Sequence, residues 1–123
     1  MTTPDEQVAR ELARLSASFV EQLPEQVGAV NGELAAWLDA PLDAARYETL
    51  SHKVHQLKGA GTTFGCPGVS RAARTLERHI GAYRSDIHAG RRPASAAVES
   101  ALEQLQNEAT RAKTLSRDPE GGR

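Results

Sequence analysis

The sequence predicts an all-α protein, an up-and-down antiparallel four-helix bundle with an additional N-terminal helix. Three observations indicate this fold. Apolar residues recur in steps of three and four along five successive stretches, which is the period of an amphipathic helix. No stretch shows the strict alternation of a half-buried strand. Short links containing proline or glycine join the stretches, so sequence neighbours are expected to pack antiparallel.

The first two expected helices cover residues 4–22 and 24–39. Thr3, followed by a proline and then by Glu6, has the sequence of a capping box, so the first helix is expected to begin there. Pro24 either kinks one long helix or opens a second helix, because a proline inside a helix removes a backbone hydrogen bond, and we expect a second helix. The first helix is expected to bury one apolar stripe, made of Val8, Leu12, Leu15 and Phe19.

Three further helices are expected after a short link. Asp43 can cap a helix that ends near Gly65. Pro67 suits the first position of the next helix, which the segment 89–93 interrupts. The last helix is expected to reach Leu115.

Length and composition limit the classes of function that the chain can have. We expect residues 1–115 to form one domain and the polar segment 116–123 to be disordered. A formal charge of -1 argues against a nucleic-acid partner, which usually needs a basic surface. A single cysteine, Cys66, fits a reducing compartment. The first residues lack the basic-then-apolar order of a secretion signal, and no apolar run approaches the length needed to cross a bilayer. We therefore expect a cytoplasmic protein without a membrane partner.

The third expected helix carries residues that its packing does not require. His55 lies on the side of the helix away from the apolar stripe, with Lys58 and Thr62 as neighbours along the helix. Gly59 lies beside the histidine, where it clears space for another molecule to reach the ring. Gly61 lies on the buried stripe, where a missing side chain lets a neighbouring helix approach closely. We expect His55 to be a functional residue.

These residues resemble a known family. The segment His55-Gln-Leu-Lys-Gly-Ala-Gly-Thr-Thr-Phe-Gly65, followed by Val69 and by the pair Leu76-Glu77, is similar to the signature of histidine-containing phosphotransfer (HPt) domains. The resemblance covers roughly residues 17–115. One position departs from it, since many members carry serine where this chain has Ala60.

The resemblance implies a function and a set of roles. His55 would be the phosphoacceptor, reacting through its outer ring nitrogen, and Lys58 would offset phosphoryl charge. Gly59 and Thr62 would give the partner access, and Glu77 would hydrogen-bond the inner ring nitrogen. The partners would be receiver domains of response regulators and a hybrid histidine kinase, with Mg²⁺ held on the receiver. The chain would act as a monomeric relay, without a cofactor of its own and without autonomous kinase activity.

Other interpretations of the sequence are open. Residues 62–80 also resemble a helix-turn-helix, with Ser70, Arg71 and Arg74 placed for DNA. A helical adaptor that binds receivers without transferring phosphoryl groups is a third possibility. Glu48, His52 and His55 have the spacing of transition-metal ligands, but an exposed helix face without supporting residues is a poor site, and we expect no metal there.

Overall fold

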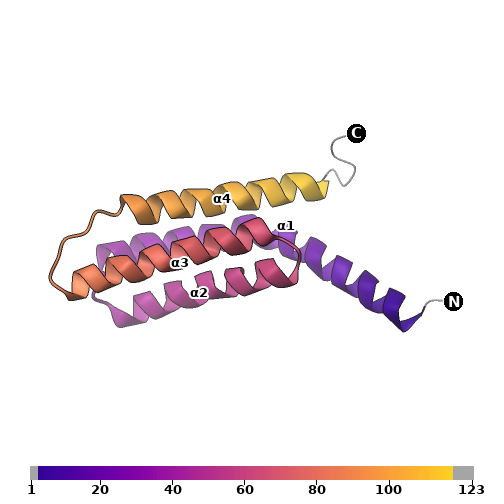
Figure 1. Cartoon of the computed structure of the whole chain (residues 1–123), viewed down its shortest axis with the longest axis horizontal. Helices are drawn as coiled ribbons and strands as arrows, with labels where there is room; N and C mark the ends of the chain where they lie inside the picture. Colours follow the sequence, from indigo (N-terminus) through magenta and orange to yellow (C-terminus); the bar gives the residue numbers. More distant parts are fainter. Residues whose placement is uncertain (1–2, 118–123) are drawn as a thin grey trace.

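The computed structural model describes residues 3–117, which form four helices and no strand. They are α1 (Pro4–Asp39), α2 (Ala44–Thr63), α3 (Pro67–His88) and α4 (Ala96–Arg117). α1 and α3 each pack against both α2 and α4, which gives an antiparallel bundle (Figure 1). The all-α expectation is confirmed. Within residues 3–117, no helix has the length and apolar character needed to cross a membrane.

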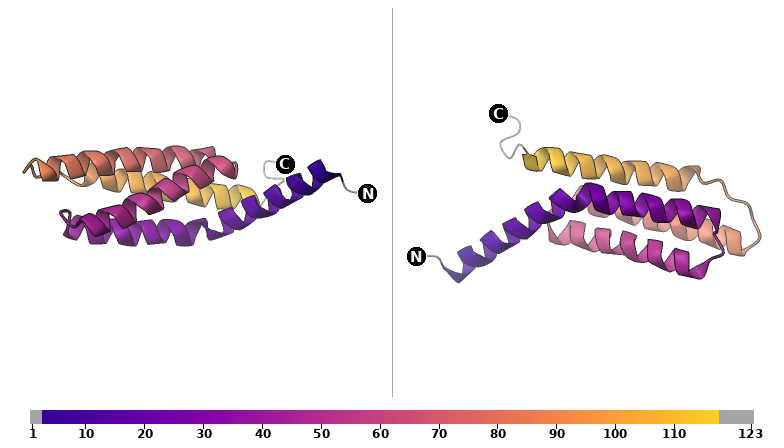
Figure 2. Two further views of the ribbon diagram at one scale, coloured as in Figure 1. Left: turned by 90° about the horizontal axis from the view of Figure 1, so that it is seen from below. Right: turned by 180° about the vertical axis from the view of Figure 1, so that it is seen from behind.

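The expected additional N-terminal helix is not a separate element. The structure joins the expected helices 4–22 and 24–39 into α1, with Pro24 in its interior. A proline there costs about 3 kcal/mol because one backbone hydrogen bond is lost. The side chains of Leu23 and Val27 on either side of it are buried in the core, so the backbone bends instead of ending the helix. Figure 2 shows the first part of α1 leaving the bundle at an angle.

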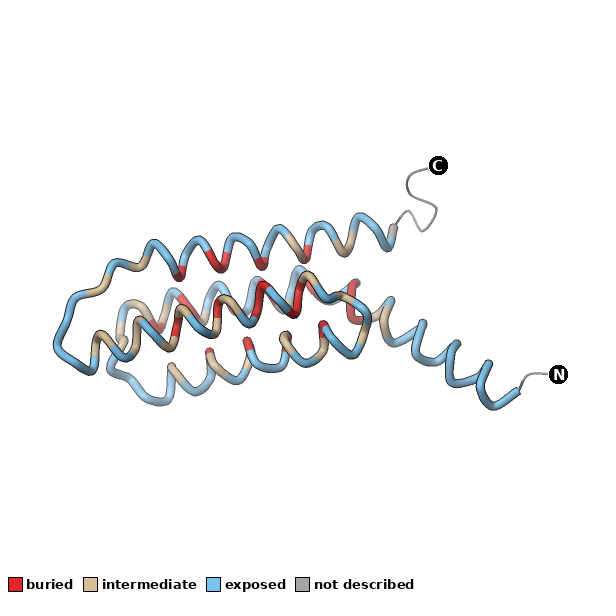
Figure 3. The backbone as a smooth tube through the Cα atoms, in the orientation of Figure 1, coloured by how far each residue is buried: buried red, intermediate tan, exposed pale blue. Residues whose placement is uncertain are grey.

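The first part of α1, residues 4–18, is called the N-terminal arm below. The expected burial of its apolar stripe is wrong for three of four residues, since Val8, Leu12 and Leu15 are 66%, 46% and 39% exposed. Phe19 is the first buried member, and its ring packs against Phe64 with 5.4 Å between centroids. Because Phe64 follows the last residue of α2, the bundle ends at this level and the arm extends beyond it (Figure 3).

Most of the core consists of aliphatic side chains, together with the aromatic Trp37 and Phe19. All four helices contribute, and truncating one such buried leucine typically costs about 2–5 kcal/mol. The side chains that are almost completely buried are Trp37, Leu23, Leu34, Leu50, Leu76, Ile80, Leu105, Val30, Val54, Val69 and Val98.

Local signals fix the helix ends. The Thr3 hydroxyl accepts from the Glu6 amide at 3.1 Å, which confirms the expected capping box. Asp43 caps α2 by accepting from the Arg46 amide at 3.1 Å. Gly65 has a φ of +76°, a left-handed conformation that favours glycine and ends α2. These contacts fix where α1 and α2 begin and where α2 ends.

The C-terminal helix is longer than expected. α4 runs to Arg117 and so includes the first two residues of the segment predicted to be disordered, 116–123. The rest of that segment lies outside the described residues. The expected domain boundary at residue 115 therefore falls inside a helix.

Candidate functional site

His55 is presented from the middle of α2. The buried residues Leu50, Val54 and Leu57 hold one face of α2 against the core. His55 lies away from this face, and its side chain is 67% exposed. An incoming molecule can therefore reach the imidazole from solvent.

Glu77 of α3 brings the predicted site residues together. Its Oε2 lies 3.4 Å from Nδ1 of His55, and its Oε1 accepts a hydrogen bond from Nζ of Lys58 at 2.8 Å. The side chains of Glu77 and Lys58 are 33% and 25% exposed, so this pair is partly shielded from solvent. One carboxylate thus contacts both the imidazole and the ammonium. The sequence motif places Lys58 and Glu77 at the site separately and gives no sign that they pair.

The charge of Glu77 follows from these contacts. The hydrogen bond from the Lys58 ammonium holds the pKa of the Glu77 carboxyl below its usual value, and His55 adds in the same direction. Partial burial opposes this effect. Glu77 is therefore ionised at neutral pH and can accept a hydrogen bond from Nδ1–H of the imidazole.

The two glycines predicted to serve different purposes have different surroundings. A Cβ on Gly61 would lie 2.9 Å from the backbone nitrogen of Ser70 and 3.1 Å from the carbonyl oxygen of Cys66. This confirms the predicted close approach of a neighbouring helix, because the first turn of α3 lies directly against Gly61. A Cβ on Gly59 would meet nothing within 4 Å. The surface beside the imidazole is open at Gly59.

Ser70 is a structural residue that the sequence does not single out in this role. It is 5% exposed, and its hydroxyl donates to the carbonyl oxygen of Lys58 at 2.8 Å. The Thr62 hydroxyl lies 2.8 Å from the same Ser70 oxygen, so Thr62 faces α3 in part. The predicted DNA contact of Ser70 is wrong, because the side chain is buried between helices. Its register with Ala73 and Glu77, in steps of three and four, is the signal that could have placed it facing α2.

The predicted spacing of metal ligands does not form a metal centre. Within residues 3–117, no group of three histidine, cysteine, aspartate or glutamate side chains could hold an ion. Glu48, His52 and His55 instead line a shallow hollow of about 310 Å³, with Glu77 on its other side. This hollow is the space next to the imidazole that an incoming group would enter.

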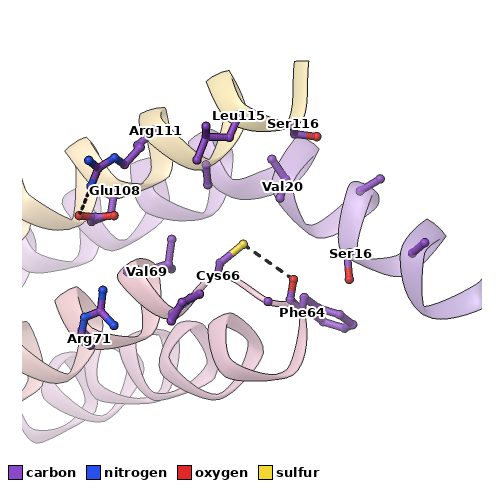
Figure 4. Close-up of a pocket in the computed structure, with 16 residues that line it drawn as sticks. Ser16, Val20, Phe64, Cys66, Val69, Arg71, Glu108, Arg111, Leu115 and Ser116 are labelled. Carbon is purple, nitrogen blue, oxygen red and sulfur yellow. Dashed lines mark hydrogen bonds and ion pairs between the residues drawn. The ribbon is translucent and has the colours of Figure 1, made fainter. Parts of the chain in front are cut away.

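A larger hollow lies elsewhere in residues 3–117. It measures about 800 Å³ and lies between the N-terminal arm, the α2–α3 turn and the end of α4 (Figure 4). Glu108 and Arg111 form an ion pair at its edge, and Cys66 points into it. Burial raises the pKa of the Cys66 thiol, which makes it a weak nucleophile. His55 does not line this hollow, so the chemistry of the imidazole does not depend on it.

Comparison with known proteins identifies the family. The model of one protein family, described as the Hpt domain, matches residues 14–110, which include the whole segment from His55 to Glu77. Searches of curated proteins and of solved structures gave no significant match. The helix-turn-helix and adaptor interpretations find no support in these comparisons. The chain belongs to the Hpt domain family, whose members carry phosphoryl groups on a histidine in two-component phosphorelays.

Proposed function

We propose that His55 is the phosphoacceptor of this chain and that it reacts through Nε2. The observation that carries the proposal is the position of Glu77, whose carboxylate faces Nδ1 of an imidazole that is 67% exposed. A hydrogen on Nδ1, held by the carboxylate, leaves the lone pair on Nε2. Nε2 is then the nitrogen available to an incoming phosphoryl group.

The transfer balances with the groups present. Nε2 forms a bond to phosphorus while the bond between phosphorus and the aspartyl oxygen of the receiver breaks, and the receiver's carboxylate leaves. The proton on Nδ1 stays in place, so the ring becomes positively charged as the bond forms. The ionised Glu77 carboxylate stabilises this positive charge. Reversal of the same step returns the phosphoryl group to a receiver.

Lys58 reduces the electrostatic repulsion between the Glu77 carboxylate and a phosphoryl group on His55. A phosphoryl group carries about two negative charges, and an unpaired carboxylate beside it would repel it. Lys58 pairs with Glu77 at 2.8 Å and offsets its charge. The ammonium has three donors, so it can keep this hydrogen bond and donate to a phosphoryl oxygen as well.

The partner supplies what this chain does not. We expect the receiver domain to bring the Mg²⁺ ion and the phosphorylated aspartate, and a hybrid kinase to supply the phosphoryl group upstream. The open surface at Gly59, with Thr62 one turn further, would lie under the receiver's loops. His55, Lys58 and Glu77 all come from one chain, so a monomer suffices for the transfer, with no kinase activity of its own. We place this reaction in the cytoplasm. A reducing compartment suits a chain whose single thiol, Cys66, cannot form an internal disulfide.

The test is transfer from a phosphorylated receiver domain in the presence of Mg²⁺. Wild type should acquire acid-labile, base-stable phosphate, and His55→Gln should acquire none. His88→Gln is the matched control, because His88 is an exposed histidine at the end of α3 that does not line the hollow beside His55, and it should be labelled like wild type. Labelling of His55→Gln at the wild-type level would reject the assignment. Lys58→Ala should slow transfer while the helical circular dichroism is kept, whereas loss of that signal would make Lys58 a structural residue.

A further inference from the structure

The N-terminal arm has an apolar face that nothing in the described chain covers. Val8, Leu12 and Leu15 are exposed, and their spacing in steps of four and three continues the face of α1 that carries the buried Phe19. Figure 3 shows almost the whole arm coloured as exposed. The side of the arm away from this stripe carries Arg10 and Arg14, and Arg14 pairs with Glu11, which flanks the stripe. A contiguous apolar stripe with a charged back is typical of a surface that packs against another helix.

We propose that two copies of this chain associate through their N-terminal arms, packed antiparallel. The stripe has the steps four, three, four of a coiled-coil seam. When Leu12 lies opposite Leu15 of the second copy, Val8 lies opposite Phe19. A two-fold axis then repeats each of these pairs, so the stripe forms four apolar layers. The arm is complementary to itself in this register.

The residues that flank the seam permit this register. Ala9 lies opposite Ser16 of the second copy on one side, so the backbones can approach closely. Glu11 lies opposite Ser18 on the other side, which gives a contact without like charges. No pair of like charges meets across the seam.

A groove in the bundle continues the stripe. It measures about 490 Å³ and lies between α1 and α2, and Leu15, Phe19 and Phe64 contribute to its walls. A stable interface buries about 600 Å² or more on each partner, which three exposed side chains do not supply alone. The first turn of the second copy would lie in this groove and add the remaining contact area.

Charge complementarity supports that placement. The first turn of α1 carries Asp5 and Glu6. In the proposed register it lies over Gln22, which lines the groove together with Lys53 of α2. Lys53 makes no ion pair within residues 3–117, so its ammonium is available to the acidic turn of the second copy. The positive charge of Lys53 in the groove is thus complementary to the negative charges of Asp5 and Glu6.

The association leaves the phosphotransfer face open. Lys53 and His55 are two residues apart on α2, which puts them about 200° apart around the helix. The groove and the imidazole therefore lie on opposite sides of α2. A dimer would present two independent His55 sites, each able to bind a receiver domain.

The first test is sedimentation equilibrium of the full chain over about a hundredfold range of concentration. The mass of wild type should rise from the 13.2 kDa of one chain to twice that value. Leu12→Glu should remain at the mass of one chain, because a carboxylate would be buried in the seam. Leu42→Glu is the matched control, since Leu42 is 69% exposed and lies far from the arm, and it should associate like wild type. A wild type that stays at one chain mass, or a Leu12→Glu variant that doubles in mass, would overturn the proposal.

The second test measures the register. In a Cys66→Ser background, Leu12→Cys and Leu15→Cys chains should form a mixed disulfide when oxidised together, because the two positions face each other. A disulfide forms only when the two Cα atoms lie within about 7 Å of each other. In a parallel arrangement, residue 12 of one copy would instead lie opposite residue 12 of the other. Rapid cross-linking of Leu12→Cys alone would refute the antiparallel arrangement.

Discussion

Replacing Gly59 or Gly61 by alanine adds the same methyl group two residues apart on α2, and the structure predicts opposite effects. In a helix, alanine is favoured over glycine by about 1 kcal/mol at either position. At Gly59 the methyl group meets nothing within 4 Å, so the whole gain is kept. At Gly61 it would lie 2.9 Å from the backbone nitrogen of Ser70, which cannot turn away as a side chain can. Such overpacking costs about 1–3 kcal/mol.

The two variants should therefore lie on either side of wild type. We expect Gly59→Ala to raise the free energy of unfolding by about 0.5–1 kcal/mol and Gly61→Ala to lower it by about 1 kcal/mol. Urea unfolding followed by circular dichroism measures both, with unchanged slopes as the sign that only stability has changed. An increase in stability for Gly61→Ala equal to that of Gly59→Ala would refute the close approach of α2 and α3.

The rates of phosphotransfer should rank the two variants in the opposite order to their stabilities. Gly59→Ala adds a methyl group to the surface beside His55, where the receiver would approach, so it should slow transfer while the protein becomes more stable. Gly61→Ala alters a buried contact and should transfer at close to the wild-type rate wherever it is folded. If Gly59→Ala transferred phosphoryl groups at the wild-type rate, a role for Gly59 in giving the receiver access to His55 would be excluded.

Two further predictions concern the residues that join α3 to α2. Ser70→Ala should lower the free energy of unfolding by about 1 kcal/mol, because a buried hydrogen bond to the Lys58 carbonyl is lost, whereas the exposed Thr63→Ala should change it by less than about 0.5 kcal/mol in the same urea titrations. The lowered pKa of Glu77 means that its ion pair stabilises the folded state above the pKa of the unfolded carboxyl, about 4.3, and that this stabilisation is lost as the pH falls through the lower folded value. Glu77→Gln should thus be less stable than wild type by about 0.5–1 kcal/mol near pH 7, with the difference shrinking below about pH 4. A difference that does not change with pH would argue against the ion pair.

Helix ends and most buried faces could be predicted because they depend on short-range chemistry. Thr3 and Asp43 cap helices through contacts three residues away, so their effect is visible in the local sequence. The steps of three and four at Leu50, Val54 and Leu57 define a face, and in the bundle that face is buried.

The arm shows what periodicity does not determine. Val8, Leu12 and Leu15 have the same spacing as the buried residues of α2, yet they are exposed. A period identifies an apolar face, but it does not identify the element that covers it. The effect of Pro24 could not be predicted for a similar reason. The free-energy cost of a proline in a helix is local, but α1 stays continuous because Leu23 and Val27 pack against other helices.

The contact between Glu77 and His55 could not be predicted from the sequence of either helix alone. It can be related to one other contact between α2 and α3. The first turn of α3 touches α2 where Ser70 lies against Gly61. Glu77 is seven residues further along α3, a rise of about 10 Å, and in an antiparallel pair this leads back by the same distance along α2. That point on α2 is level with His55, and Nδ1 lies 3.4 Å from the carboxylate there. The close contact between Gly61 and Ser70 is therefore in register with the contact between His55 and Glu77. A change that slid α3 by one turn would leave the buried faces matched but would place a different residue beside the reacting nitrogen.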